Sequence, residues 1–255
     1  MINILDFPLL VFALTFVAMW LSTWLGAAYR RRREKLEEAE HEDYGVVLAA
    51  SLTLLGLIIG FSFSMATSRY DQRKNLEEEE ANAIGTEYVR ADLLPAADAA
   101  KVRPLLRSYL DQRILFYSIR DPDQVRKVNA RTAQLQNELW AAVLPPAVAQ
   151  PTQITALAVS GMNDVLNSQG YSQAAWWNRL PVAGWAMMGA IALCCSALFG
   201  YLERNVKRDR LLHVVLPFIV SLSFFLIADI DSPRWGVIHV RPQNLISLAE
   251  SLRPQ

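Results

Sequence analysis

Four long stretches of the chain contain no aspartate, glutamate, lysine or arginine. They are Phe7–Tyr29, Tyr44–Ser68, Leu180–Leu202 and Leu211–Ala228, and they run for 23, 25, 23 and 18 residues. A helix needs roughly 20 apolar residues to cross the hydrocarbon core of a bilayer. The pattern therefore predicts four membrane spans, and the lipid bilayer is an expected partner of the chain.

The polar segment between the second and third spans has a helical pattern and no alternation typical of strands. We expect the second span to continue as one helix to Leu94, before Pro95. Further helices are expected from about Pro104, over Pro122–Leu144 and over Thr152–Asn167, each ended by Pro or Gly.

These patterns predict an all-α integral membrane protein with four transmembrane helices and an inserted helical-bundle domain between spans 2 and 3. We expect transmembrane helices 1 and 2 within residues 1–68 and the extramembrane domain within residues 69–179. Transmembrane helices 3 and 4 follow within residues 180–230, and residues 231–255 form a C-terminal tail.

Composition narrows the function. The 25 basic and 25 acidic residues balance, which argues against a nucleic-acid partner. The two cysteines, Cys194 and Cys195, are adjacent within a span, so they suit neither a disulfide nor a metal site. No phosphate loop, metal-protease or nucleophile motif is present, so we expect no enzyme activity, cofactor or metal.

Basic residues suggest an orientation. Arg30–Arg33 and Lys35 follow span 1, and Arg204, Lys207, Arg208 and Arg210 lie between spans 3 and 4. Positive charge collects on the cytoplasmic side of short loops, which places the domain 69–179 outside. Arg69, Arg73 and Lys74 directly follow span 2 and favour the opposite orientation.

Span 2 carries a stripe of small residues at steps of three or four: Ala49, Thr53, Gly56, Gly60, Ser64 and Thr67. Small residues allow close packing of membrane helices, so packing is one interpretation. The other is a helix that lines a pore, with Thr53, Leu57, Phe61 and Ser64 along the path. In a ring of copies, Leu57 and Phe61 would form an apolar collar that gates by dewetting.

The order Gly60-Phe61, then six intervening residues, then Ser68-Arg69-Tyr70, resembles the end of the pore helix of bestrophins. The resemblance implies a pentameric anion channel whose neck maps onto Thr53, Leu57 and Phe61. The stretch from Asp229 to Gly236 is similar to the turn after the last bestrophin helix, without the acidic run of the calcium clasp, so calcium gating is not implied.

Asn82–Tyr88, within Asn75–Pro95, also resembles a bacterial family of bestrophin-like membrane proteins of unknown function. We identify the chain as a member. Membership implies a homo-oligomer in the bacterial inner membrane. Bestrophin topology would place the domain 69–179 in the cytoplasm, opposite to the orientation predicted from charge.

Charges beyond the collar are candidates for ion selectivity: Arg69, Arg73, Glu77 and Glu80. Rings of Arg favour anions and rings of Glu favour cations; the basic pair lies nearer the membrane and, with the resemblance, favours anions. A charged side chain at membrane depth is stabilised by an oppositely charged partner, so we predict that Arg69 pairs with Asp229 or Asp231. The alternative is that the arginine and the aspartates each reach solvent without meeting.

The resulting hypothesis is a channel subunit that conducts inorganic ions passively through a hydrophobic neck on span 2. The alternative is a non-conducting membrane sensor or scaffold whose long second helix couples the helical domain to the bilayer. An intramembrane enzyme is a third possibility, for which the sequence offers no nucleophile and base.

Overall fold

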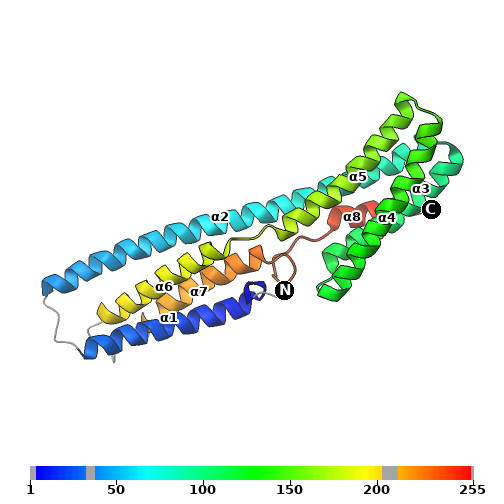
Figure 1. Ribbon diagram of the computed structural model, residues 1–255. Helices are drawn as coiled ribbons and strands as arrows, with labels where there is room; N and C mark the ends of the chain where they lie inside the picture. The colour runs from blue at the N-terminus through cyan, green and yellow to red at the C-terminus, as the bar shows by residue number, and fades with distance from the viewer. Residues whose placement is uncertain (1–3, 33–37, 203–211, 254–255) are drawn as a thin grey trace. The chain divides into compact units, whose positions relative to one another are not determined.

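The structure is a computed structural model that describes residues 4–32, 38–202 and 212–253. Within these residues all regular elements are helices, as predicted, and no strand occurs. The α-helices are α1 (Pro8–Arg31), α2 (Glu38–Arg90), α3 (Ala96–Ser118), α4 (Pro122–Ala149), α5 (Gln153–Trp177), α6 (Val182–Leu202), α7 (Leu212–Asp231) and α8 (Gln243–Ser251), with 3-10 turns at Ile4–Asp6 and Ala91–Leu93 (Figure 1).

The chain forms two compact units. Unit 1 contains residues 1–69 and 179–239, and unit 2 contains residues 70–178 and 240–255. The predicted tail 231–255 is thus divided between them. Its second part belongs to unit 2 because Leu245 of α8 is fully buried there and Leu248 packs against the same core.

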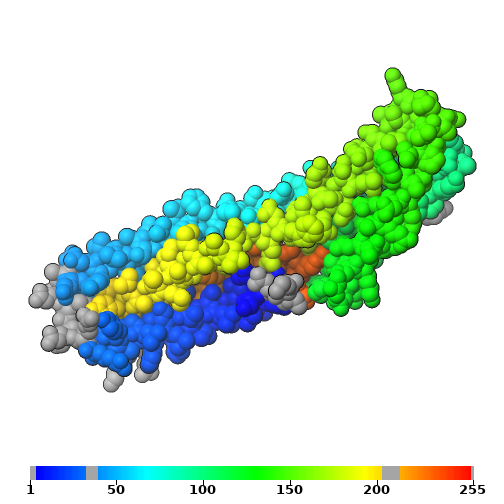
Figure 2. All heavy atoms as spheres, viewed as in Figure 1, coloured from blue at the N-terminus to red at the C-terminus, as the bar shows by residue number. Residues whose placement is uncertain are grey.

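Unit 1 is built around α1, which packs against both α6 and α7. The surfaces of α1 and α6 lie against each other in the space-filling view (Figure 2). Its exterior is apolar: Leu9, Leu25 and Ile219 are 74%, 60% and 56% exposed. Four helical stretches of the described chain have the length and composition to cross a membrane. An apolar exterior on helices of this length is that of a membrane protein.

Helix α2 contributes to both units as one uninterrupted element of 53 residues (Figure 1). At 1.5 Å per residue it is about 80 Å long. It ends at Arg90 and not at Leu94, because a 3-10 turn over Ala91–Leu93 precedes the extended Leu94 and the helix-stopping Pro95.

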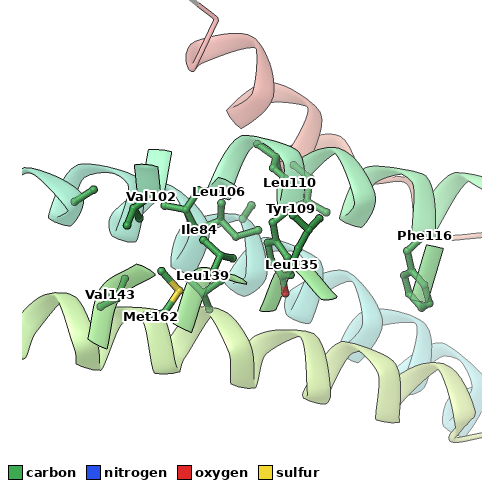
Figure 3. Close-up of a cluster of buried hydrophobic side chains, with 14 of the residues drawn as sticks. Ile84, Val102, Leu106, Tyr109, Leu110, Phe116, Leu135, Leu139, Val143 and Met162 are labelled. Atoms are coloured by element: carbon green, nitrogen blue, oxygen red, sulfur yellow. The ribbon is translucent and has the colours of Figure 1, made fainter. Parts of the chain in front are cut away.

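The core of unit 2 is formed by side chains that α2, α3, α4 and α5 direct toward one another (Figure 3). Ile84, Leu106, Leu135, Leu139 and Met162 are all completely buried in it. Every member of this cluster belongs to unit 2.

Three further predicted helix boundaries are wrong. Helix α3 begins at Ala96 and includes Pro104; α4 continues through Pro145 and Pro146 to Ala149; α5 continues through Gly170 to Trp177. In each case the added turns carry buried residues, such as Val102, Pro146 and Trp176, so tertiary packing offsets the poor helix propensity.

The basic residues behind the predicted orientation fall mostly outside the described residues. Those are Arg33, Lys35, Arg204, Lys207, Arg208 and Arg210. Arg30, Arg31 and Arg32 are described, at the C-terminal end of α1.

Candidate functional site

The predicted pore row lies on an exposed face of α2. Thr53, Leu57, Phe61 and Ser64 are all exposed, Leu57 at 54% and Phe61 at 63%. A Cβ added at Gly60 would meet no heavy atom of the described chain within 4 Å, and the same holds for Gly56. Within the described chain this face is therefore open.

The opposite face of α2 is buried within unit 1. Its buried positions are Leu48, Leu55, Ser62 and Ala66. At about 100° per residue, Thr53, Leu57 and Ser64 lie within about 20° of the direction opposite Leu55, and Phe61 about 60° from it. The predicted row thus faces away from the unit to which it belongs.

Close helix packing in unit 1 occurs elsewhere, between α1 and α6. A Cβ at Gly26 would lie 2.0 Å from the carbonyl oxygen of Ala197, and one at Gly200 would lie 1.9 Å from that of Thr23. These two glycines allow the backbones to touch, as small residues do in membrane helices. Packing was one of two interpretations of the stripe with Gly56 and Gly60 in span 2, and no comparable signal in the sequence marked Gly26 and Gly200.

Asp231 connects the ends of several helices in unit 1. Its carboxylate lies 3.7 Å from Nη1 of Arg69 and 3.5 Å from Nε of Arg179, and it accepts hydrogen bonds from the backbone N–H of Leu180 at 3.1 and 3.2 Å. Arg179 also pairs with Asp6. A buried carboxylate with two guanidinium neighbours is well compensated.

Asp229 has a different role from Asp231. Its two carboxylate oxygens accept hydrogen bonds from the backbone N–H groups of Val237 and Ile238, at 2.7 and 2.8 Å. A Cβ at Gly236 would lie 2.1 Å from the carbonyl oxygen of Asp229, so the turn requires a glycine there. Asp229 therefore closes the turn after α7, and of the two predicted partners it is Asp231 that lies beside Arg69.

Arg73 does not lie on an open helix face. It is 2% exposed, and within unit 2 it donates hydrogen bonds from Nε to the carbonyl of Ala175 and from Nη2 to that of Asn178, both at 3.2 Å. These carbonyls belong to the C-terminal end of α5, where a cation satisfies otherwise unpaired acceptors.

Glu77 caps the N-terminus of α8. It is 1% exposed, and its Oε1 accepts from the backbone N–H of Asn244 at 2.9 Å and of Leu245 at 3.0 Å, while Oε2 accepts from Nδ2 of Asn244 at 2.6 Å. A carboxylate at the first turn of a helix pairs orphan N–H groups and complements the helix dipole. Glu77 is thereby a structural contact between α2 and α8.

Glu80 is the centre of a buried polar cluster. It pairs with Arg113, and its Oε2 accepts from the hydroxyls of Tyr117 at 3.2 Å and Ser172 at 3.1 Å. Burial, and then the charge of Glu80, raise the pKa of Tyr117 above its ordinary value. The cluster joins α2, α3 and α5, and the sequence analysis missed Arg113 as its cation.

The expected selectivity role of Arg73, Glu77 and Glu80 does not agree with these positions. A charge that acts on a passing ion must reach the water of the pore, whereas all three are buried and fully engaged inside unit 2. Arg69 is 15% exposed and lies beside Asp231. The four residues hold the fold together in the described chain.

Glu87 is a further buried carboxyl that the sequence did not single out. Neither of its oxygens accepts a hydrogen bond from the described residues. Its pKa is raised from 4.5 to about 8. Burial is the largest cause, the charge of Arg90 opposes it, and the charge of Asp164 raises the pKa further. A Cβ at Gly161 would lie 2.1 Å from its Oε2, so this glycine makes room for the carboxyl.

Within the residues that the structure describes, no group of three or more His, Cys, Asp or Glu side chains could hold a metal ion. Apart from Glu87, the buried charged side chains described above are paired with opposite charges, backbone groups or hydroxyls. The feature left for function is the open face of α2.

Four helices of membrane-spanning length, a second helical core and a long second helix that contributes to both units define an all-α integral membrane protein. A family model for the bestrophin-like domain matches residues 9–245. The chain belongs to the bestrophin-like family.

Solved structures show the same fold. A crystal structure of a bacterial bestrophin homologue from Klebsiella pneumoniae superposes with a TM-score of 0.63 at 15% identity, over 96% of this chain and 99% of that one. A variant of that homologue gives a TM-score of 0.62 at 14% identity, over 96% and 97% of the two chains. The comparison with curated proteins gives no match.

Proposed function

We propose that the chain is one subunit of a homo-oligomeric ion channel in the bacterial inner membrane, and that ions pass along the open face of α2. The observation that carries the proposal is the position of Thr53, Leu57, Phe61 and Ser64: exposed in the subunit and turned away from its buried face. Membership in the bestrophin-like family supports a channel, and the resemblance to bestrophins implies five copies.

Leu57 and Phe61 would form the neck. In a ring of copies each contributes a collar of apolar side chains, and water leaves a narrow apolar constriction, which stops ion flow. Thr53 donates its hydroxyl hydrogen to the carbonyl of Ala49 at 2.9 Å, so its oxygen is oriented to accept from water in the path. Motion that moves the α2 helices apart would wet the neck and start conduction.

The permeant ion follows from the charges on the same face of α2. Anion preference rested on Arg69 and Arg73, which are held inside the subunit. About two and four turns beyond Ser64 the same side of α2 carries Asp71 and Glu78, both exposed. Exposed carboxylates attract cations, so we propose cation preference; the bestrophin resemblance supports the anion alternative.

Reversal potentials in a potassium chloride gradient distinguish the two. Cation preference predicts a potential displaced toward the equilibrium potential of potassium, and Asp71→Asn should move it toward zero. Asp123→Asn removes an exposed carboxylate from α4 and serves as the control. A potential near that of chloride in the unmodified protein would refute cation preference and leave the channel proposal intact.

Conduction itself is tested by Phe61→Ala in planar bilayers. Removing the ring widens the neck, so the current should grow several-fold. Phe63→Ala is the matched control, because Phe63 is an exposed phenylalanine of the same helix about 160° away. Absence of current in all three proteins would favour the non-conducting sensor or scaffold, and equal gains in both variants would exclude a neck at Phe61.

Orientation has two competing expectations, external from the charge rule and cytoplasmic from bestrophin topology. Arg126 is exposed on α4 and suits labelling as Arg126→Cys in a chain without its native cysteines. Reaction with a membrane-impermeant thiol reagent in intact cells would place unit 2 outside, and reaction only after permeabilisation would place it in the cytoplasm.

A further inference from the structure

A cavity of about 540 Å³ opens in unit 1 where one end of each of α1, α2 and α6 meets the others. Its walls include Leu25 and Tyr29 of α1, Tyr44 of α2, and Leu198 and Tyr201 of α6. The volume is within the range of small-molecule sites, roughly 300–1,000 Å³. Because Leu25 is 60% exposed on the apolar exterior, the cavity is accessible to lipid.

Three tyrosines form the rim of this cavity. The ring centroid of Tyr201 lies 6.0 Å from that of Tyr29 and 5.7 Å from that of Tyr44. Tyrosine prefers the boundary between hydrocarbon and water, with its ring toward the apolar side and its hydroxyl toward the polar side. The rim therefore marks the depth of the headgroups, and the leucine walls lie on the acyl-chain side.

Positive charge adjoins the rim. Nη1 of Arg30 donates to the carbonyl of Tyr201 at 3.0 Å, and its guanidinium carbon lies 6.0 Å from the centroid of that ring. Arg31 and Arg32 follow in the chain and are exposed. None of the described lining residues is acidic. An apolar cavity with a tyrosine rim and exposed arginines is complementary to one acyl chain joined to a phosphate.

We propose that this cavity binds an anionic phospholipid, with an acyl chain against Leu25 and Leu198 and the phosphate beside Arg31 and Arg32. Basic pockets between membrane helices bind anionic headgroups in this way. The site is formed within one subunit and lies on the far side of the membrane from Asp231. It does not depend on ion conduction, and its test uses no current.

The test is lipid binding by native mass spectrometry of the full-length protein in detergent. Dioleoyl phosphatidylglycerol and dioleoyl phosphatidylcholine share their acyl chains and differ in headgroup charge. The unmodified protein should retain phosphatidylglycerol at least tenfold more tightly. Arg31→Gln with Arg32→Gln should remove that preference, because each basic residue near a membrane contributes about fivefold. Arg120→Gln with Arg126→Gln, in unit 2, should leave it unchanged.

A second pair of variants tests the cavity. Leu198→Trp fills it and should weaken binding of both lipids, whereas Leu193→Trp, on another face of α6, should weaken neither. Circular dichroism and elution volume establish that each variant is folded. Equal retention of the two lipids, an unchanged preference in the double arginine variant, or binding unaffected by Leu198→Trp would overturn the proposal. So would a cross-link between two copies through Leu198→Cys, which would show a neighbouring subunit in the cavity.

Discussion

Glu87 predicts how the stability of unit 2 depends on pH. Its carboxyl is fully buried without a hydrogen-bond donor from the described residues, and its pKa is raised from 4.5 to about 8. The folded protein therefore keeps a proton at neutral pH that the unfolded chain releases above pH 4.5. This group's contribution to stability is fully present below pH 4.5 and is lost as pH rises to about 8.

The magnitude follows from the same values. Each pH unit well inside that window costs about 1.4 kcal/mol and the slope halves at pH 8, so raising the pH from 6 to 8 should lower the free energy of unfolding by about 2 kcal/mol. For a chain of this size the melting temperature should fall by about 5–10 °C. Glu87→Gln keeps the shape and does not titrate, so the variant should lose this dependence and be more stable than the unmodified protein at pH 9.

Thermal unfolding in detergent at pH 6, 8 and 9, followed by circular dichroism, measures the effect. Glu79→Gln is the control, because Glu79 is exposed on the same helix and should leave the pH profile unchanged. If the unmodified protein and Glu87→Gln fall in parallel between pH 6 and 8, Glu87 is not the titrating group and the reasoning from its burial is refuted.

Two further predictions concern packing. Arg113→Met leaves Glu80 as an uncompensated buried charge and should lower the free energy of unfolding, measured by chemical denaturation, by about 3–5 kcal/mol. The double variant with Glu80→Met removes both charges and should lose less than Arg113→Met alone. A larger loss in the double variant would contradict this. Gly26→Val should prevent correct assembly of α1 with α6, because even its Cβ would meet the Ala197 carbonyl at 2.0 Å. Gly60→Ala should be tolerated, and size-exclusion chromatography of the two proteins would show the contrast.

The membrane spans could be predicted because the signal is physical and local. Charged side chains are expensive in hydrocarbon, so a run without them, such as Tyr44–Ser68, marks a span whatever it packs against. The long helix that continues from it was also predictable, because Pro95 is the first residue that must stop it.

The extension of α2 was misread because its buried face carries charges. Buried positions in unit 2 recur at steps of three and four: Arg73, Glu77, Glu80, Ile84, Glu87 and Ala91. This period is that of a packed helix face, and it could have indicated burial. The partners could not be predicted, because Ser172 lies 92 residues from Glu80 and Asn244 lies 167 residues from Glu77, and both donors are uncharged.

The prolines within α3 and α4 also show that tertiary contacts cannot be predicted from local sequence. Local rules place a helix boundary at Pro104 and at Pro145-Pro146, yet Val102 and Pro146 are buried in unit 2. Packing stabilises those turns by more than the proline costs, and the sequence alone does not reveal which neighbours will be available.

The capping of α8 by Glu77 has a consequence for biosynthesis. The ribosome makes Asn244 and Leu245 only after all four spans, so Glu77 lacks its partners while the spans are being synthesised. Until then unit 2 holds a carboxylate without its ligands and an uncovered patch where Leu245 will lie. A chain that ended before Asn244 would keep this defect, because Glu77 would have no helix N-terminus to cap.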